Sequence, residues 1–167
     1  GSIESCPMDA PTANPAPATA ALSELELTGR ARTHVRVVPE LRCQLHPKAA
    51  AALQAMRAAA ARNGIDLLPV SGYRDFDRQL AIWNGKFRGG RPLLDRDGRP
   101  LEAAAMSEAE RVAAILVWSA LPGASRHHWG SDCDVIDRAV QPAGAAVELL
   151  ATQYAADGCY ARLAAWL

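Results

Sequence analysis

Two stretches of the chain combine helical apolar spacing with clear signals for where a helix begins. Residues 46–64 consist mainly of good helix formers, above all alanine, Pro47 suits a first helical turn, and Gly64 is a natural stop. Ser107 and Glu110 have the spacing of a capping box, which marks the start of a helix that runs to about residue 120. Both stretches are predicted to be α-helices.

Shorter patterns fill the rest of the chain. Residues 75–85 form a third predicted helix, with an N-cap aspartate at its start and Asn-Gly at its end. Residues 65–70 and 132–137 have the composition of strands, and the turn signals in residues 88–101 predict a loop or hairpin. One more helix is predicted within residues 154–167. Helices and strands in this order indicate an α+β fold.

The two ends of the chain differ from its middle. Residues 1–22 are rich in proline, alanine and threonine without apolar periodicity, so they are predicted to be a flexible leader before a domain at residues 23–167. The apolar pattern of the last helix runs through Trp166 and Leu167 without a stop signal. The expectation from this pattern is a domain that continues past residue 167.

The overall charge excludes some classes of partner. The 18 Lys and Arg residues balance the 18 Asp and Glu residues, which gives no reason to expect nucleic acid or an anionic membrane as a partner. No apolar run reaches the roughly 18–20 residues that span a bilayer. Because the net charge is zero, a charged substrate must be bound by local groups.

The four cysteines lack CxxC spacing, which leaves free thiols or a disulfide as alternatives.

Titratable side chains are most concentrated in residues 125–137, SRHHWGSDCDVID. His127 in a loop and Asp134 on a strand would supply an imidazole nitrogen and a carboxylate oxygen, which are both good zinc ligands. Alternation along the strand places the Asp132 carboxylate beside Asp134 and turns Cys133 away from the metal. A polar loop that only caps and forms hydrogen bonds is the alternative.

A second group of polar residues lies in SGYRDFDRQ, residues 71–79. Arg74 follows a predicted strand and precedes a predicted helix, where a guanidinium can hold a carboxylate through two hydrogen bonds. A surface salt bridge from Arg74 to Asp75 or Asp77 is the alternative.

Together, these two stretches resemble the zinc D-alanyl-D-alanine carboxypeptidases of the VanY-like type. The family pattern is SGYR…Q followed by S-x-H-x-x-G-x-x-x-D, and the resemblance covers residues 45–167. It implies an α+β fold with a small central antiparallel sheet flanked by helices, shared with the Hedgehog signalling domain. It also implies that Zn²⁺ is the cofactor, that peptidoglycan stem peptides are the substrates, and that the protein acts in the periplasm or cell envelope.

The resemblance assigns roles to five residues of this chain. His127 and Asp134 correspond to two of the three zinc ligands, and Ser125 corresponds to the serine that contacts the substrate. Arg74 corresponds to the arginine that holds the terminal carboxylate of the peptide, and Gln79 is a weaker match nearby.

Two departures from the family pattern change the expected activity. Asp132 stands where many members have alanine, and it would lie in the surroundings of the zinc ligands. The late E-x-x-H motif, which supplies the third ligand and the catalytic glutamate, is absent, because no Glu or His follows Glu148. The expected function is a zinc-dependent carboxypeptidase, C-terminally incomplete, with these 167 residues alone inactive or nearly so. The alternatives are a non-catalytic peptidoglycan- or peptide-binding module and a Hedgehog-like domain that uses a metal for stability.

Overall fold

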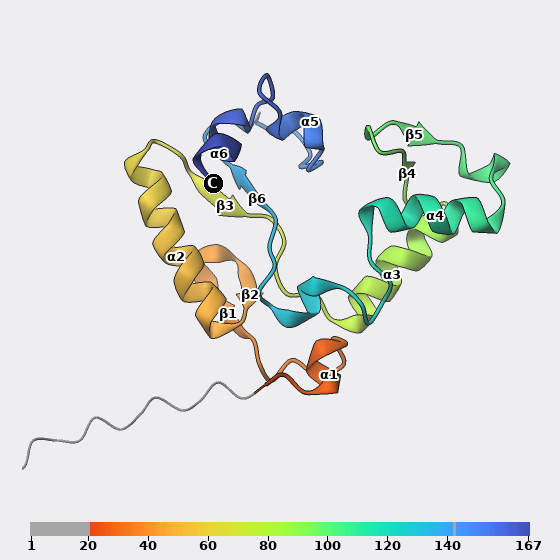
Figure 1. Cartoon of the computed structure of the whole chain (residues 1–167), viewed down its shortest axis with the longest axis horizontal. Helices are drawn as coiled ribbons and strands as arrows, with labels where there is room; N and C mark the ends of the chain where they lie inside the picture. Colours follow the sequence, from red (N-terminus) through yellow and green to blue (C-terminus); the bar gives the residue numbers. More distant parts are fainter. Residues whose placement is uncertain (1–20, 142) are drawn as a thin grey trace, which may run out of the picture.

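The computed structural model describes residues 21–141 and 143–167, so the leader predicted for residues 1–22 lies almost entirely outside the described chain. The described chain begins with helix α1 (Glu24–Leu27), which a capping box starts. Helices and short antiparallel strands follow one another along the chain, which confirms the predicted α+β class (Figure 1). Within the described residues, the strands form three two-stranded sheets.

Helix α2 (Pro47–Arg62) lies beside the strands on one side of the molecule (Figure 1). Strand β1 (Arg36–Val38) pairs with β2 (Cys43–Leu45), and β3 (Leu67–Pro69) pairs with β6 (Val135–Asp137). The main hydrophobic core lies among these elements and the last helix. Its buried members include Leu45, Leu53, Ile65, Leu67, Ile136 and Leu163.

The other side of the molecule is formed by helices α3 (Phe76–Phe87) and α4 (Glu108–Trp118) and by the hairpin of β4 (Leu93–Leu94) and β5 (Pro100–Leu101) (Figure 1). Helix α4 contacts both α3 and β4, and it buries Ile115 completely. Short 3-10 helices connect the elements: η1 (Pro39–Leu41), η2 (Ala103–Ala105) and η3 (Arg126–Trp129).

The structure confirms the helix predicted over residues 46–64, the capping-box helix and the hairpin, but it corrects the end of α3. The helix was expected to end at Asn84-Gly85, whereas it continues to Phe87. Gly85 stays helical, and a Cβ there would lie 3.1 Å from the Arg91 Cδ atom that packs over it. The positive φ of 77° at Gly89 lies just past the C-cap, as is typical of a helix end.

The structure confirms the helix predicted within residues 154–167 and adds a short helix that ends at Tyr154. Helix α5 (Ala151–Tyr154) and helix α6 (Ala161–Trp166) are separated by a turn. Gly158 lies in this turn, and a Cβ on it would collide with the backbone oxygens of residues 152 and 153. Within the described chain, no helix is both long and apolar enough to cross a membrane.

Candidate metal centre

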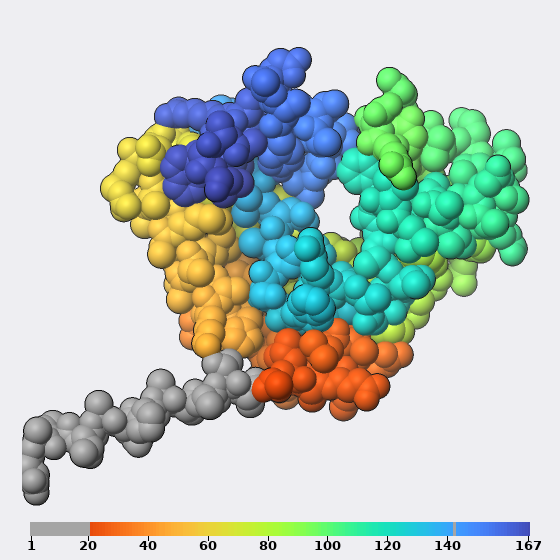
Figure 2. Space-filling view, viewed as in Figure 1, coloured from red at the N-terminus to blue at the C-terminus, as the bar shows by residue number. Residues whose placement is uncertain are grey.

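A cleft of about 1230 Å³ lies between the two sides of the molecule. Figure 2 shows it as the hollow between the C-terminal part, in blue, and the α3–α4 side, in green and teal. Of the six site residues predicted from the sequence, five line this cleft; they are Arg74, Ser125, His127, Asp132 and Asp134. The sixth, Gln79, is fully buried and bonded to Arg74.

The orientation of the His127 ring is set by the backbone beside it. Its Nδ1 atom lies 3.2 Å from the carbonyl oxygen of Asp132, and a carbonyl can only accept a hydrogen bond. Nδ1 therefore carries the proton, and in the neutral ring the lone pair is on Nε2. This Nε2 atom lies 3.7 Å from Oδ2 of Asp134, so the free nitrogen and the carboxylate face each other in the cleft.

Asp134 is positioned by the strand pairing that precedes it. It directly precedes β6, and the Val70 N–H donates to its carbonyl oxygen at 2.9 Å, which extends the β3–β6 ladder by one residue. The next residue, Ser71, then faces the Asp134 side chain. The Ser71 hydroxyl donates to Asp134 Oδ2 and accepts a hydrogen bond of 3.1 Å from the Asp134 N–H. Ser71 was not singled out from the sequence, although it is the first residue of the SGYR motif.

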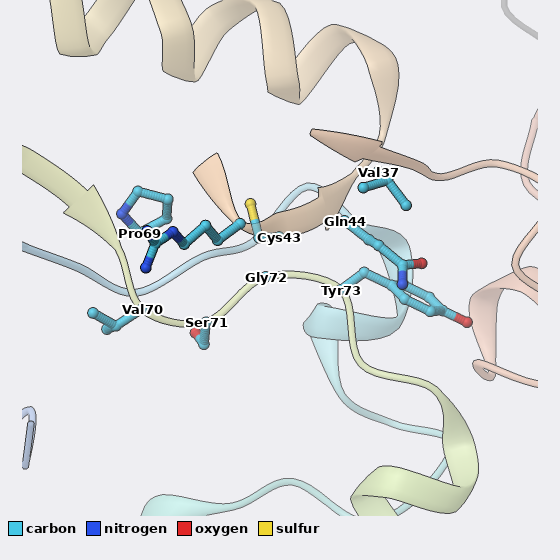
Figure 3. Close-up of a pocket in the computed structure, with 9 residues that line it drawn as sticks. Val37, Cys43, Gln44, Pro69, Val70, Ser71, Gly72 and Tyr73 are labelled. Atoms are coloured by element: carbon cyan, nitrogen blue, oxygen red, sulfur yellow. The ribbon is translucent and has the colours of Figure 1, made fainter. Parts of the chain in front are cut away.

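The segment of residues 70–73 lies between the cleft and a second pocket of about 370 Å³ (Figure 3). The Tyr73 N–H donates to the Gln44 carbonyl oxygen at 2.8 Å, which ties the segment to β2. A Cβ on Gly72 would lie 2.9 Å from the same oxygen, so this close approach requires glycine. The SGYR sequence therefore fixes the backbone between Ser71, which contacts Asp134, and Arg74.

Asp132 contacts His127 through its backbone carbonyl oxygen, whereas its carboxylate is paired with another residue. The Asp132 side chain pairs with Arg126, with 3.0 Å between Nε and Oδ2. The predicted strand begins later than expected, at Val135, so the alternation used to place Asp132 beside Asp134 does not apply. Cys133 packs against the hydrophobic core, and burial raises its pKa to about 11, which is unfavourable for a thiolate ligand.

Arg74 points toward the α3–α4 side of the cleft. Its Nη1 atom donates to Gln79 Oε1 at 2.7 Å, and Gln79 Nε2 donates to the Ala120 carbonyl oxygen at 2.6 Å. Burial lowers the pKa of Arg74, while the nearby Asp134 carboxylate acts in the other direction. Within the described chain, Arg74 forms no ion pair with Asp75, whose carboxylate instead caps α3. The geometry favours a guanidinium that faces the cleft.

Ser125 and His128 complete the loop that carries His127. Ser125 is 3% exposed and lines the cleft, and within the described residues its hydroxyl forms no hydrogen bond. His128 lies outside the cleft and is fully buried. Its Nδ1 atom donates to the Arg74 carbonyl oxygen at 2.6 Å, and its Nε2 atom accepts from the Gly123 N–H at 3.0 Å. His128 thus supports the loop in its neutral form, and burial lowers its pKa.

Lys86 and Arg91 also line the cleft, and neither was predicted from the sequence. A signal was present, because Gln79 and Lys86 are seven residues apart and lie on one face of helix α3. Lys86 is half-buried, and its Nζ atom donates to the Ser119 hydroxyl at 2.8 Å. The cleft therefore has two chemically different walls: an acidic wall of His127, Asp134 and Ser71, and a basic wall of Arg74, Lys86 and Arg91.

The acidic wall has the donors for one side of a metal ion. Two ligand atoms on a tetrahedral zinc ion are about 3.4 Å apart, given bond lengths near 2.0–2.2 Å, and the His127 and Asp134 atoms are 3.7 Å apart. Among the described residues, no group of three or more His, Cys, Asp and Glu side chains is placed to hold a metal. The two donors fit zinc in kind and spacing, but the described residues hold only part of its usual coordination shell.

Comparison with known proteins identifies relatives of this chain. The sequence model of the VanY family, described as D-alanyl-D-alanine carboxypeptidase, matches residues 42–163. An uncharacterized protein of Haemophilus influenzae is 41% identical over 98 residues, which make up 57% of this chain and 67% of that protein.

Two solved structures are also similar. VanYB in complex with D-alanine-D-alanine has a TM-score of 0.52 and 20% identity, over 66% of this chain and 55% of that one. A VanY D,D-pentapeptidase variant in complex with Zn(II) has a TM-score of 0.49 and 22% identity, over 64% and 53% of the two chains. The chain thus spans about half the length of these proteins, and the first likeness supports the α+β fold.

Proposed function

We propose, from the premise that the chain belongs to the VanY family of D-alanyl-D-alanine carboxypeptidases, that its cleft is the site of a zinc-dependent carboxypeptidase. The substrates would be peptidoglycan stem peptides, from which the C-terminal D-amino acid is removed, in the periplasm or cell envelope. One observation carries this proposal: the free Nε2 atom of His127 faces Asp134 at 3.7 Å in the same cleft as Arg74.

The residues of the two walls would have different roles in binding. His127 and Asp134 would hold zinc, which supplies polarisation of the scissile carbonyl and a lowered pKa for the attacking water. Arg74 would hold the terminal carboxylate of the peptide by charge-assisted hydrogen bonds, with Gln79 fixing the guanidinium in place. Ser125, whose hydroxyl is free of other bonds in the described chain, would contact the same end of the peptide.

Two donors bind zinc weakly, because a catalytic zinc ion usually has three protein ligands. We therefore also propose that these 167 residues by themselves bind zinc and peptide but release D-alanine slowly or not at all. The same two-donor arrangement favours a second candidate, a non-catalytic module that binds peptidoglycan peptides.

The test is to titrate the purified chain with zinc and with acetyl-Lys-D-Ala-D-Ala by calorimetry, and to assay D-alanine release in the same samples. We expect one zinc per chain, lost in His127→Ala but kept in His46→Asn, a control whose residue lies at the N-cap of α2 and not in the cleft.

Three results would change the proposal. Zinc binding that is unchanged in His127→Ala would contradict the metal site. Peptide binding without any zinc binding would favour the non-catalytic module. Robust D-alanine release by the chain would contradict the proposed inactivity.

A further inference from the structure

The basic wall holds more positive charge than a single terminal carboxylate needs. Arg74, Lys86 and Arg91 all line the cleft, and Arg91 lies over Gly85 at the end of α3, next to Lys86. Burial lowers the pKa of Lys86, and the charges of Arg91 and Arg74 lower it further, so the three cations are close enough to repel one another. Keeping like charges together in a partly buried site is unfavourable unless a counter-charge binds there.

Among the described residues, no carboxylate forms an ion pair with this cluster, although Asp134 acts on Arg74 from a greater distance. Within the described chain, no Asp or Glu oxygen lies within 4.0 Å of a charged nitrogen of Arg74, Lys86 or Arg91. Glu148 lines the same cleft but pairs with none of them. Lys86 donates to the neutral Ser119 hydroxyl, and an ammonium has two further hydrogens to donate.

The positions of Lys86 and Arg74 along the cleft are distinct. Arg74 is bonded to Gln79, and Lys86 is seven residues further along α3, which is about 10 Å of helix. The two side chains are bonded to neighbouring residues of one loop, Arg74 through Gln79 to Ala120 and Lys86 to Ser119. Asp134 affects the pKa of Arg74, whereas Lys86 is affected only by Arg91 and Arg74 among the charged groups. Asp134 therefore acts on Arg74 and not on Lys86, which indicates that Lys86 is further from the acidic wall than Arg74 is.

We propose that Lys86 and Arg91 form a second anion subsite, which binds a carboxylate on the part of the peptide that leaves after cleavage. This inference rests on the proposed function, because Arg74 and the acidic wall set the direction of the peptide. The carboxylate has two sources: the side chain of an acidic C-terminal residue, or the terminal carboxylate of a leaving group that is one residue longer. In both cases it lies beyond Arg74, as seen from the metal ligands.

Two matched pairs of peptides distinguish these sources. Their binding to the chain is measured by calorimetry in the presence of zinc. The first pair is acetyl-Lys-D-Ala-D-Glu and acetyl-Lys-D-Ala-D-Gln, which differ only in side-chain charge. The second pair is acetyl-Lys-D-Ala-D-Ala-D-Ala and its C-terminal amide. We expect the anionic member of at least one pair to bind about tenfold more tightly, as for a hydrogen bond to a charged group.

The variants show whether the subsite causes this preference. Lys86→Gln and Arg91→Gln are expected to reduce the tenfold preference to about twofold or less. Arg88→Gln removes the same charge from the same end of α3; Arg88 is exposed like Arg91 but does not line the cleft, so this control should keep the preference. A circular dichroism spectrum of each variant confirms that it is folded.

The results separate this inference from the proposed function. Equal binding within both pairs by the wild type would overturn the subsite alone, as would an equal loss of preference in Arg88→Gln. If acetyl-Lys-D-Ala-D-Ala and the other free-carboxylate peptides all failed to bind, the proposed function and the subsite would both be overturned.

Discussion

The acidic and basic walls of the cleft are built in different ways. On the acidic wall, His127 is oriented by a backbone carbonyl and Asp134 by a serine that the strand pairing places opposite it. On the basic wall, Arg74 is held by the Gln79 side chain, and Lys86 by the hydroxyl of Ser119, which directly follows α4. The first wall is oriented by backbone and strand contacts, as the proposed metal site requires, whereas the second is held by side-chain hydrogen bonds around the proposed binding site of the peptide end.

This difference predicts which substitutions affect the metal and which affect the peptide. Asp134→Asn removes a charged donor, and we expect zinc affinity to fall by more than about a hundredfold. Asp132→Asn is the matched control, because the Asp132 carboxylate pairs with Arg126 and only its backbone contacts His127. Competition with a chromophoric chelator measures both affinities. A loss of similar size in Asp132→Asn would mean that its carboxylate, contrary to the structure, takes part in the metal site.

On the basic wall, Arg74→Ala should weaken binding of acetyl-Lys-D-Ala-D-Ala by about 10- to 100-fold, since a hydrogen bond to a charged group is lost in a half-buried site. The C-terminal amide of the same peptide should bind wild type and variant nearly equally, and zinc affinity should stay unchanged. Calorimetry with both peptides measures this. Equal weakening for the acid and the amide would show that Arg74 acts on the fold and not on the carboxylate.

A smaller effect is expected where a residue only orients a metal ligand. Ser71→Ala removes the hydroxyl that donates to Asp134, and we expect zinc affinity to fall about tenfold while peptide binding through Arg74 is kept. Ser71→Thr, which retains a hydroxyl, should recover part of this loss. If Ser71→Ala bound zinc as tightly as the wild type, the orientation of Asp134 would have to come from the backbone alone.

The smallest effect concerns the support of β6, and it depends on pH. The Tyr154 hydroxyl donates to the Val135 carbonyl oxygen at 2.8 Å, and burial raises the pKa of Tyr154 to about 12. Below pH 10 the hydroxyl is protonated in both folded and unfolded chains, so Tyr154→Phe should cost about 1 kcal/mol of unfolding free energy for the lost hydrogen bond.

Between pH 10 and about 12, only the unfolded tyrosine ionises, so this contribution of Tyr154 to stability falls as the pH rises. The stability difference between wild type and Tyr154→Phe should therefore shrink across this range. Urea unfolding at a series of pH values measures it, and a constant difference would show that Tyr154 keeps its ordinary pKa in the folded chain.

The elements that could be predicted from the sequence are those with strong local signals. Pro47 and the Ser107–Glu110 capping box marked the starts of α2 and α4 correctly. The same capping-box spacing at Ser23 and Glu26 starts helix α1, a helix of four residues that was not predicted. The end of α3 was misplaced because Asn84-Gly85 is a turn signal that the chain does not use: Gly85 stays helical, and the glycine with positive φ is Gly89.

In the candidate site, too, the residues with strong local signals could be predicted and those that depend on tertiary contacts could not. His127 and Asp134 lie in one dense motif of titratable side chains, so residue type and spacing could indicate that they lie close together, as the structure has them. Ser71 could not, because its role depends on the register between β3 and β6. Lys86 shares a helix face with Gln79 in the sequence pattern, but only the packing of α3 against α4 shows that it lines the cleft.

The most direct test of the two-wall account is a crystal structure of the protein soaked with zinc and D-Ala-D-Ala, with anomalous diffraction data at the zinc edge. We expect an anomalous peak within bonding distance of His127 Nε2 and the Asp134 carboxylate, with the peptide carboxylate hydrogen-bonded to Arg74. A peak at any other position, or a peptide bound with its carboxylate away from Arg74, would contradict it.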